Sequence, residues 1–217
     1  MVSEKMYVLG TKKSTIRTIF EFGQKRAAEV GAENVFDFSL GNPNVPVPDF
    51  IRDAAVDILM HGDPTEVHGY TIAPGKPTVR EALAADLKRR FGMEVTGKNL
   101  FMTAGAAASV TITFKALTEP GDEFVTFAPF FPEYRVFVEA CGGKLVVVPA
   151  KTDDFQIDLT ALERALTPQT KAVIVNSPNN PSGAVYRETT IRHLADLLRA
   201  KEQEYGHPIF IVADEPY

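Results

Sequence analysis

Ala172-Val173-Ile174-Val175-Asn176-Ser177-Pro178-Asn179-Asn180-Pro181-Ser182-Gly183 is the stretch that decides the fold. Its first four residues are apolar without alternation, which is typical of a strand buried on both faces of a parallel sheet. The Asn-, Pro- and Gly-rich residues that follow predict a turn. A second apolar run, Ile209–Ala213, ends in Asp214-Glu215-Pro216-Tyr217. Both stretches therefore predict strands whose carboxyl ends carry polar residues.

Similar runs recur along the chain and alternate with helical patterns. Strands are expected at Leu100–Thr103, Glu123–Phe127, Lys144–Val148, Lys171–Val175 and Pro208–Ala213. Helices are expected between them, at about 105–117, 131–141, 158–166 and 187–203. This alternation predicts an α/β fold with a doubly wound, mostly parallel sheet.

The residues before this alternation predict a separate segment. Residues 1–36 are typical of an arm and a helix, and Val35–Leu40 is a short strand-like run. A loop with three prolines follows at 41–48, so we place a boundary near Pro48, with a helix at 49–61.

A further helix is expected downstream of that segment. Thr78 and Glu81 have the spacing of a capping box, which predicts its start. Gly92 predicts its end.

The composition excludes several classes of protein. The chain has 217 residues, enough for one large core or for one core with a small appendage. Its net charge of −5 argues against a nucleic-acid surface. Cys141 is the single cysteine, and the four histidines lack metal-ligand spacing, so neither an intrachain disulfide nor a metal site is expected. No segment is typical of a signal peptide or membrane span, which favours a cytoplasmic protein with no membrane partner.

Three features at expected strand ends are candidates for ligand contacts, because ligands of open α/β sheets lie beyond the carboxyl ends of the strands. Small residues at Thr103–Ser109 open a helix, whose free N–H groups favour a phosphate. The Asn176–Gly183 turn offers amides, and Asp214 offers a carboxylate. Taken singly, each has an ordinary alternative: tight packing, a plain turn and a helix N-cap, respectively.

Taken together, these motifs resemble the class I/II aminotransferases, which are pyridoxal-phosphate (PLP) enzymes of fold type I in the aspartate aminotransferase superfamily. The Asn-Pro-Ser-Gly core, the Asp-Glu-Pro-Tyr strand end and the Tyr70–Arg80 stretch occur in the family's order. The resemblance covers nearly all of the chain. It implies that residues 1–48 are the N-terminal arm and part of the small domain. Residues 49–217 would be the first part of the large PLP-binding domain, without its later strands.

The resemblance assigns the contacts to the cofactor ring. Asp214 would pair with the protonated pyridine nitrogen of PLP and raise the pKa of that nitrogen, so that the ring remains a good electron sink. Asn180 and Tyr217 would donate hydrogen bonds to the phenolic oxygen. Phe131 would stack on the face of the ring.

It also assigns contacts to the phosphate and the substrate. Gly105, Ala106 and Ala107 would hold the phosphate through backbone N–H groups. Tyr70 would reach the phosphate of the neighbouring subunit, which implies a homodimer with shared sites. Gly41, together with Asn180, would lie near the carboxylate of the amino-acid substrate.

Parts of the family's machinery are expected beyond Tyr217. The lysine that forms the Schiff base has no match among residues 1–217, and neither has the arginine that binds the substrate carboxylate. The resemblance also implies that later strands insert between the strand near Leu100–Thr103 and the strand near Pro208–Ala213. We therefore expect that residues 1–217 do not fold alone and that the remaining C-terminal half of the enzyme is their partner.

The implied activity is exchange of an amino group between an amino acid and a 2-oxo acid by a ping-pong route. Carbon–sulfur lyases and decarboxylases share these motifs, and a non-catalytic ligand-binding fragment remains an alternative. One subgroup carries a lysine near the distal carboxylate of aspartate, at the position of Ala107. We therefore predict that any preference for aspartate does not depend on that residue.

Overall fold

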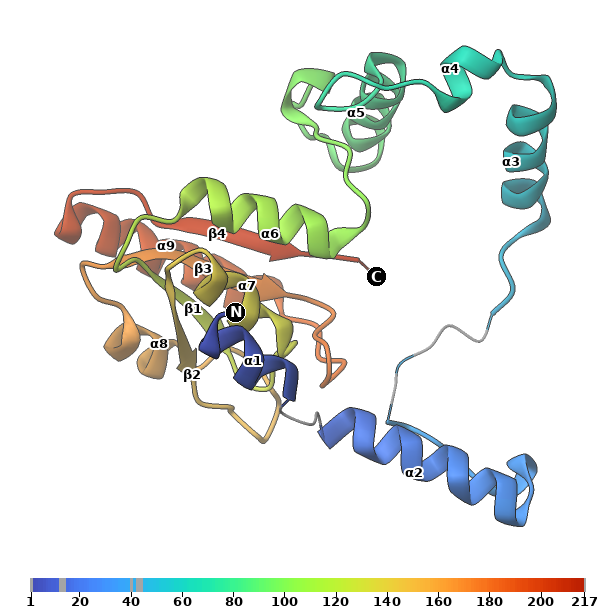
Figure 1. Ribbon diagram of the computed structural model, residues 1–217. Helices are drawn as coiled ribbons and strands as arrows, with labels where there is room; N and C mark the ends of the chain where they lie inside the picture. The colour runs from blue at the N-terminus through green and yellow to red at the C-terminus, as the bar shows by residue number, and fades with distance from the viewer. Residues whose placement is uncertain (1, 12–14, 40, 42–44, 217) are drawn as a thin grey trace. The chain divides into compact units, whose positions relative to one another are not determined.

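The computed structural model describes residues 2–11, 15–39, 41 and 45–216, and it divides into two compact units, 1–70 and 71–217 (Figure 1). The division falls further along the chain than Pro48. The assignment of residues 1–48 and 49–217 to two domains remains a prediction.

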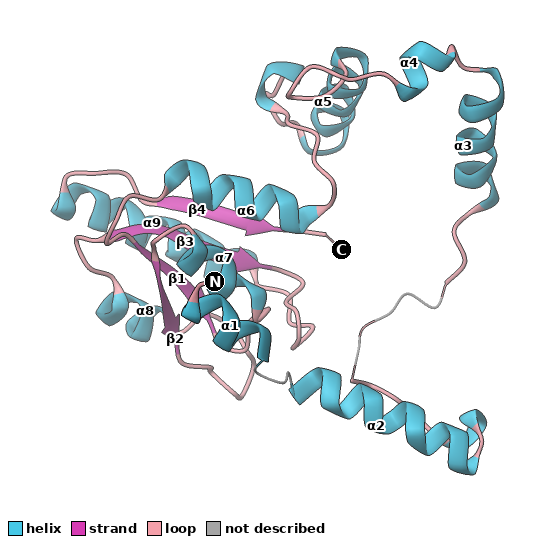
Figure 2. Cartoon of the chain, in the orientation of Figure 1, coloured by secondary structure: helices cyan, strands magenta, loops and turns pink. Residues whose placement is uncertain are grey.

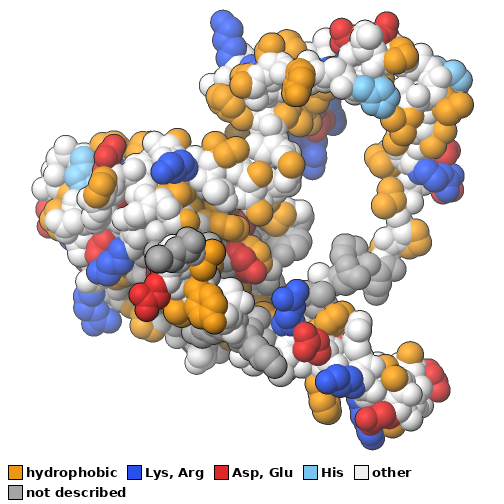
Figure 3. Space-filling model, in the orientation of Figure 1, with side chains coloured by type: hydrophobic (Ala, Val, Ile, Leu, Met, Phe, Trp, Pro, Cys, Tyr) orange, Lys and Arg blue, Asp and Glu red, His pale blue; other side chains and the backbone are white. Residues whose placement is uncertain are grey.

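The described part of the first unit is helical. Its elements are α1 (Glu4–Thr11), α2 (Thr15–Val30), η1 (Ala32–Asn34), α3 (Asp49–His61) and α4 (Pro64–His68). The helix expected at 49–61 is confirmed. Hydrophobic side chains gather along α3 (Figure 3), among them the exposed Phe50, Leu59 and Met60. This helix therefore presents apolar surface that the described residues of its own unit do not cover.

The strand expected at Val35–Leu40 is wrong for residues 35–39, and Leu40 lies outside the described residues. Local hydrogen bonds take the place of strand pairing. The N–H of Val35 donates to the carbonyl of Ala32 (3.2 Å), which closes η1. The N–H of Ser39 donates to Oδ1 of Asp37 (2.8 Å). A β-like composition without a neighbouring strand does not make a strand.

The second unit opens with α5 (Pro77–Phe91) and η2 (Gly97–Asn99). The capping box expected at Thr78 is wrong, because Lys76 is the N-cap and Pro77 begins the helix. Proline suits this first position, since its missing N–H would have no intrahelical partner. Glu81 instead accepts a hydrogen bond from the N–H of Gly97 (3.2 Å) and thereby ties η2 to α5. The helix ends before Gly92 at φ 67°, as predicted.

Four parallel strands form one sheet in the order β2-β1-β3-β4 (Figure 2). They are β1 (Glu123–Phe127), β2 (Lys144–Val148), β3 (Thr170–Asn176) and β4 (Phe210–Asp214). The sequence predicted all four to within two residues at each end. Chain order reverses at β1, which makes the sheet doubly wound. In register, Asn176 pairs with Asp214, so both residues lie at the carboxyl edge of the sheet.

Helices cover both faces of the sheet (Figure 1). They are α6 (Ala106–Leu117), α7 (Glu133–Ala140), α8 (Leu159–Ala165) and α9 (Glu188–Tyr205). Alternate residues of β3 divide between two buried clusters: Val173 packs with Leu162 and Leu194 of α8 and α9, and Ile174 packs with Phe114 and Val138 of α6 and α7. The α/β fold with a doubly wound parallel sheet is thus confirmed.

The strand expected at Leu100–Thr103 is wrong. The N–H of Met102 donates to the carbonyl of Pro74 (2.9 Å), so a loop carbonyl takes the place of a strand partner. The contact requires Gly75, where a Cβ atom would lie 2.5 Å from Cγ of Met102. Among the described residues, no helix is long and apolar enough to cross a membrane.

Candidate active site

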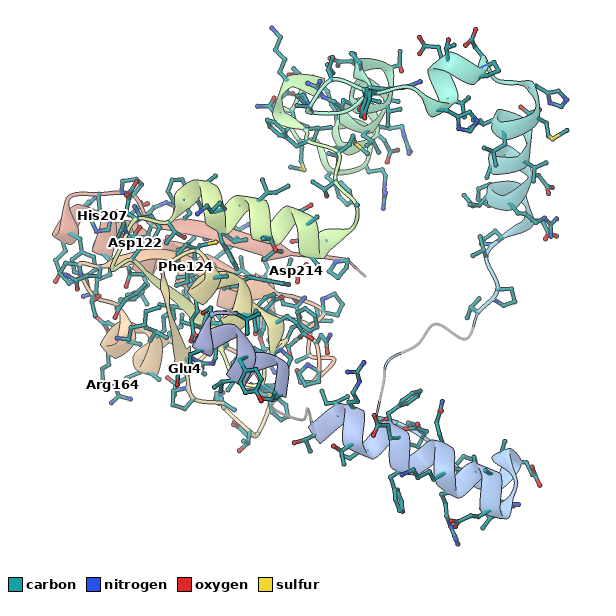
Figure 4. All side chains as sticks on the ribbon, viewed as in Figure 1. Glu4, Asp122, Phe124, Arg164, His207 and Asp214 are labelled. Carbon is teal, nitrogen blue, oxygen red and sulfur yellow. The ribbon has the colours of Figure 1, made fainter. Side chains whose placement is uncertain are left out.

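A cavity of about 170 Å³ lies where α6 and α7 meet the carboxyl edge of the sheet. In Figure 4, Asp214 lies at this end of the sheet, whereas Asp122 and His207, which precede β1 and β4, lie at the other. The residues that line the cavity come from strand ends, loops and two helices. They are Ala106, Ala107, Val110, Phe131, Tyr134, Phe137, Asn176, Asn180, Asp214 and Pro216.

The first turn of α6 forms one side of the cavity. Gly105 is its N-cap at φ 85°, a backbone conformation that favours glycine. The N–H groups of Ala106 and Ala107 follow at the first helical positions, where an α-helix provides no acceptor for them. Small side chains leave this backbone open to the cavity. The helix start can therefore receive an anionic group.

Asp214 provides a carboxylate at the end of β4. Tyr134 donates its hydroxyl hydrogen to Oδ2 of this carboxylate over 2.5 Å. Nδ2 of Asn176 donates to the backbone carbonyl of Asp214 over 2.8 Å. Both the side chain and the main chain of Asp214 are therefore fixed by neighbours, which suits a carboxylate that is partly withdrawn from water.

Asn176, which ends β3, also stabilises the turn that follows the strand. Oδ1 of Asn176 accepts the N–H of Asn180 (2.6 Å), and the carbonyl of Asn179 accepts the N–H of Gly183 (2.7 Å). Asn179 is buried, and its Oδ1 accepts from the hydroxyl of Ser182 (2.7 Å). The side-chain amide of Asn180 makes no hydrogen bond within the part of the chain that the structure describes. That amide is available to a ligand.

Apolar side chains complete the walls. The ring of Phe131 meets the ring of Tyr134 edge to face, with centroids 5.6 Å apart. Val110 and Phe137 add aliphatic and aromatic surface. Chemically, the cavity can accommodate an anion at the start of α6, a cation at Asp214 and a flat ring beside Phe131.

The structure brings together five of the residues that the sequence singled out: Ala106, Ala107, Phe131, Asn180 and Asp214. Gly105 adjoins them as the N-cap of α6. Tyr217 lies outside the described residues. Gly41 and Tyr70 belong to the first unit, where both are exposed, and their roles remain predictions.

The sequence analysis included Asn176 only as the start of the amide-rich turn, without a role of its own, and it did not single out Tyr134. Asn176 directly follows the expected strand Lys171–Val175, so it could have been placed at the same edge as Asp214. Tyr134 is three residues after Phe131, a spacing that places two side chains on one face of a helix. An aromatic residue in that position is more often part of a core. Tyr134 also packs in the buried cluster on the α6 and α7 face.

Comparisons with known proteins agree with this geometry. A family model described as aminotransferase class I and II matches residues 33–217. The probable aspartate/prephenate aminotransferase of Thermus aquaticus is 36% identical over 178 residues, which are 82% of this chain and 44% of that protein. An aminotransferase structure from Eubacterium rectale matches with a TM-score of 0.97 and 53% identity, over 100% of this chain and 55% of that chain. The aspartate aminotransferase of Thermus thermophilus with maleate matches with a TM-score of 0.80 and 31% identity, over 100% and 54%.

The chain therefore belongs to the class I and II aminotransferase family. It spans about half the length of the curated relatives it matches.

Proposed function

We propose that this chain provides the phosphate and ring contacts of a PLP-dependent aminotransferase, which transfers an amino group between an amino acid and a 2-oxo acid. One observation carries the proposal. A single cavity combines the open N–H groups at the start of α6 with the carboxylate of Asp214. Family membership supports the same reaction class.

The residues present fit this cofactor. PLP carries a phosphate and a pyridine ring, and the cavity offers a helix start for the anion and an acidic side chain for the ring nitrogen. When bound, PLP supplies the electron sink that amino-group transfer requires. Asp214 would hold a proton at the ring nitrogen, and the amide of Asn180 would donate to the phenolic oxygen. The side chain of Phe131 would pack on the face of the ring.

The apolar wall contributes in a different way. Val110, Phe131 and Phe137 line the cavity together with Asp214, so the surface beside its carboxylate is partly apolar. A charge pair that is partly withdrawn from water is screened less than an exposed one. We therefore expect the carboxylate of Asp214 to stabilise the protonated ring nitrogen more strongly than an exposed carboxylate would.

The remaining roles belong to the same proposal. Tyr70 would contact the phosphate of a second subunit in a homodimer, and the exposed apolar side chains of α3 support such an assembly. Gly41 would leave space for the substrate carboxylate. Tyr217 would donate to the phenolic oxygen beside Asn180. The Schiff-base lysine would come from the C-terminal half of the enzyme.

The first test is equilibrium binding of PLP to the whole enzyme after its cofactor has been removed, monitored by the circular dichroism induced in the cofactor's absorption band. We expect Asp214→Ala to weaken binding about 10- to 100-fold, because a charge-assisted contact is lost. Asp153→Ala is the matched control, since Asp153 is an exposed carboxylate outside the cavity, and it should leave affinity unchanged. Equal affinity of the Asp214→Ala variant and the unchanged protein would overturn the proposed site.

The reaction itself is tested with the whole enzyme. Transamination yields a 2-oxo acid from the amino acid and requires an amino acceptor. A lyase or decarboxylase of the same fold would instead release a thiol or carbon dioxide. Intact mass after borohydride reduction should show the reduced cofactor on a polypeptide that carries the lysine. Release of carbon dioxide without consumption of acceptor would contradict the proposal.

A further inference from the structure

Tyr134 makes a contact that links α7 to the end of β4. Its side chain is only 1% exposed, and its hydroxyl lies 2.5 Å from Oδ2 of Asp214, which is eighty residues away in sequence. Its ring also meets that of Phe131 edge to face. One side chain therefore contacts both the carboxylate and the aromatic wall of the cavity.

The direction of this hydrogen bond follows from the chemistry of its partners. An ionised carboxylate can only accept, so the phenol of Tyr134 must donate its single hydrogen to Oδ2 of Asp214. Within the described ranges, Oδ1 of Asp214 makes no hydrogen bond. The carboxylate thus has one oxygen held by the protein and one available to a ligand in the cavity.

The main chain of Asp214 is fixed independently. Asn176 donates to its backbone carbonyl over 2.8 Å and pairs with it in register across the sheet. With the backbone held in this way, the remaining freedom of Asp214 is rotation of its side chain. The hydrogen bond from Tyr134 restricts that rotation.

We infer that Tyr134 is a positioning residue, whose hydroxyl holds the Asp214 carboxylate in the orientation that binds a protonated ring nitrogen. The inference rests on the proposed function, since it assumes that a nitrogen heterocycle occupies the cavity. A charge-assisted hydrogen bond of this kind is stronger than a neutral one. Its loss should therefore lower affinity only for ligands that present the nitrogen.

The competing explanation is that Tyr134 merely fills the core, since it packs in the buried cluster with Val110 and Val138. Tyr134→Phe separates the two explanations, because it keeps the ring and removes only the hydroxyl. Tyr186→Phe is the matched control. Tyr186 is also buried and also packs edge to face against a phenylalanine, Phe127, but on the opposite face of the sheet.

The experiment uses the whole enzyme, freed of its cofactor, and measures its affinities for two ligands: PLP and its 1-deaza analogue, in which a C–H group replaces the ring nitrogen. We expect Tyr134→Phe to weaken PLP binding about 10- to 100-fold, the range for a lost hydrogen bond to a charged group. Binding of the deaza analogue should change less than about twofold, since it makes no ion pair with Asp214. Tyr186→Phe should change neither affinity. Far-ultraviolet circular dichroism verifies that each variant is folded.

Each outcome decides a different point. If Tyr134→Phe binds PLP as well as the unchanged protein while Asp214→Ala does not, the positioning role is wrong and the proposed function stands. If Tyr134→Phe weakens both ligands equally, the tyrosine is structural only and the inference is overturned. If the unchanged protein does not bind PLP at all, the proposed function and this inference fail together.

Discussion

The side chain of Glu123 begins β1 at the amino end of the sheet, away from the cavity. Its residue is 9% exposed, and its two oxygens accept hydrogen bonds from Nζ of Lys144 (2.7 Å) and the hydroxyl of Thr167 (2.7 Å). Burial by itself would raise the pKa of this carboxyl, but the bonds from Lys144 and Thr167 outweigh it and lower the pKa below its ordinary value of 4.5. The ionised form is therefore favoured in the folded state.

A lowered carboxyl pKa adds stability that depends on pH. Because the folded protein binds this proton less tightly than the unfolded chain, the contribution is complete above pH 4.5 and is lost as the pH falls through the lowered folded value. We expect Glu123→Gln to reduce the free energy of unfolding by about 1 kcal/mol at neutral pH. The difference should shrink as the pH falls below 4.5. Lys144 is well exposed, so solvent screening limits how much its ion pair with Glu123 stabilises the folded state.

Urea unfolding of both proteins across that pH range provides the measurement. Glu94→Gln is a suitable control, because Glu94 is exposed and pairs with the exposed Lys88. A Glu123→Gln penalty that stays constant as the pH falls would contradict this account.

At this scale the sequence revealed some residues of the site and not others. The place of Asp214 was predictable, because a polar residue at the end of an apolar strand lies at the carboxyl edge of a parallel sheet. Asn180 lies four residues beyond β3 and was singled out through the family resemblance. Tyr134 was not. Its contact with Asp214 joins residues eighty positions apart, and it depends on how α7 packs on the sheet. No spacing in the sequence encodes such a contact.

Among the elements, the buried strands were the most predictable. The run Ala172–Val175 of β3 is apolar on both faces of the sheet, so this strand stands out from the helices around it. Leu100–Thr103 has a similar composition, but its backbone bonds to the Pro74 loop. Composition alone cannot show whether a partner strand is present.

For α5 the sequence predicted the end at Gly92 but not the start, since glycine has a backbone conformation of its own. A glycine also follows α9. The chain reverses at Gly206 at φ 77°, directly after α9, and the N–H of Gly206 bonds to the carbonyl of Glu202 (2.9 Å). A Cβ atom at Gly206 would meet nothing within 4 Å. Any loss of stability caused by a side chain at this position would therefore come from the backbone conformation and not from steric crowding.

We expect Gly206→Ala to lower the free energy of unfolding by about 1 kcal/mol, because alanine resists this left-handed conformation. Gly206→Asn should cost clearly less, since asparagine adopts the conformation more readily. Thermal and urea unfolding of the three proteins would rank them. Equal stability of the alanine and glycine forms would show that the end of α9 is frayed and not held at this turn.

At the scale of the whole molecule, the two edges of the sheet in the second unit differ in how well they are covered. Both faces are covered by helices, and β2 at one edge has Leu145 and Val148 buried. At the other edge, β4 leaves Phe210 and Ile211 exposed by 41% and 46%. An apolar edge strand with unpaired backbone groups is prone to pair with another chain. The sequence predicted this open edge, because the resemblance implies further strands beside it.

The open edge leads to a prediction about association. We expect the polypeptide of residues 1–217 to associate through β4, so that its unfolding midpoint rises with protein concentration. Ile211→Lys should weaken this association, because a charge on an edge strand opposes pairing. Val136→Lys is the control, since Val136 is 41% exposed but lies on α7 and not at the edge. Sedimentation equilibrium of the three proteins, together with unfolding at several concentrations, would measure both effects.

A cooperative transition independent of concentration would contradict the expectation that these residues do not fold alone. If Ile211→Lys and Val136→Lys weaken association equally, exposed apolar surface in general drives association, and the β4 edge does not.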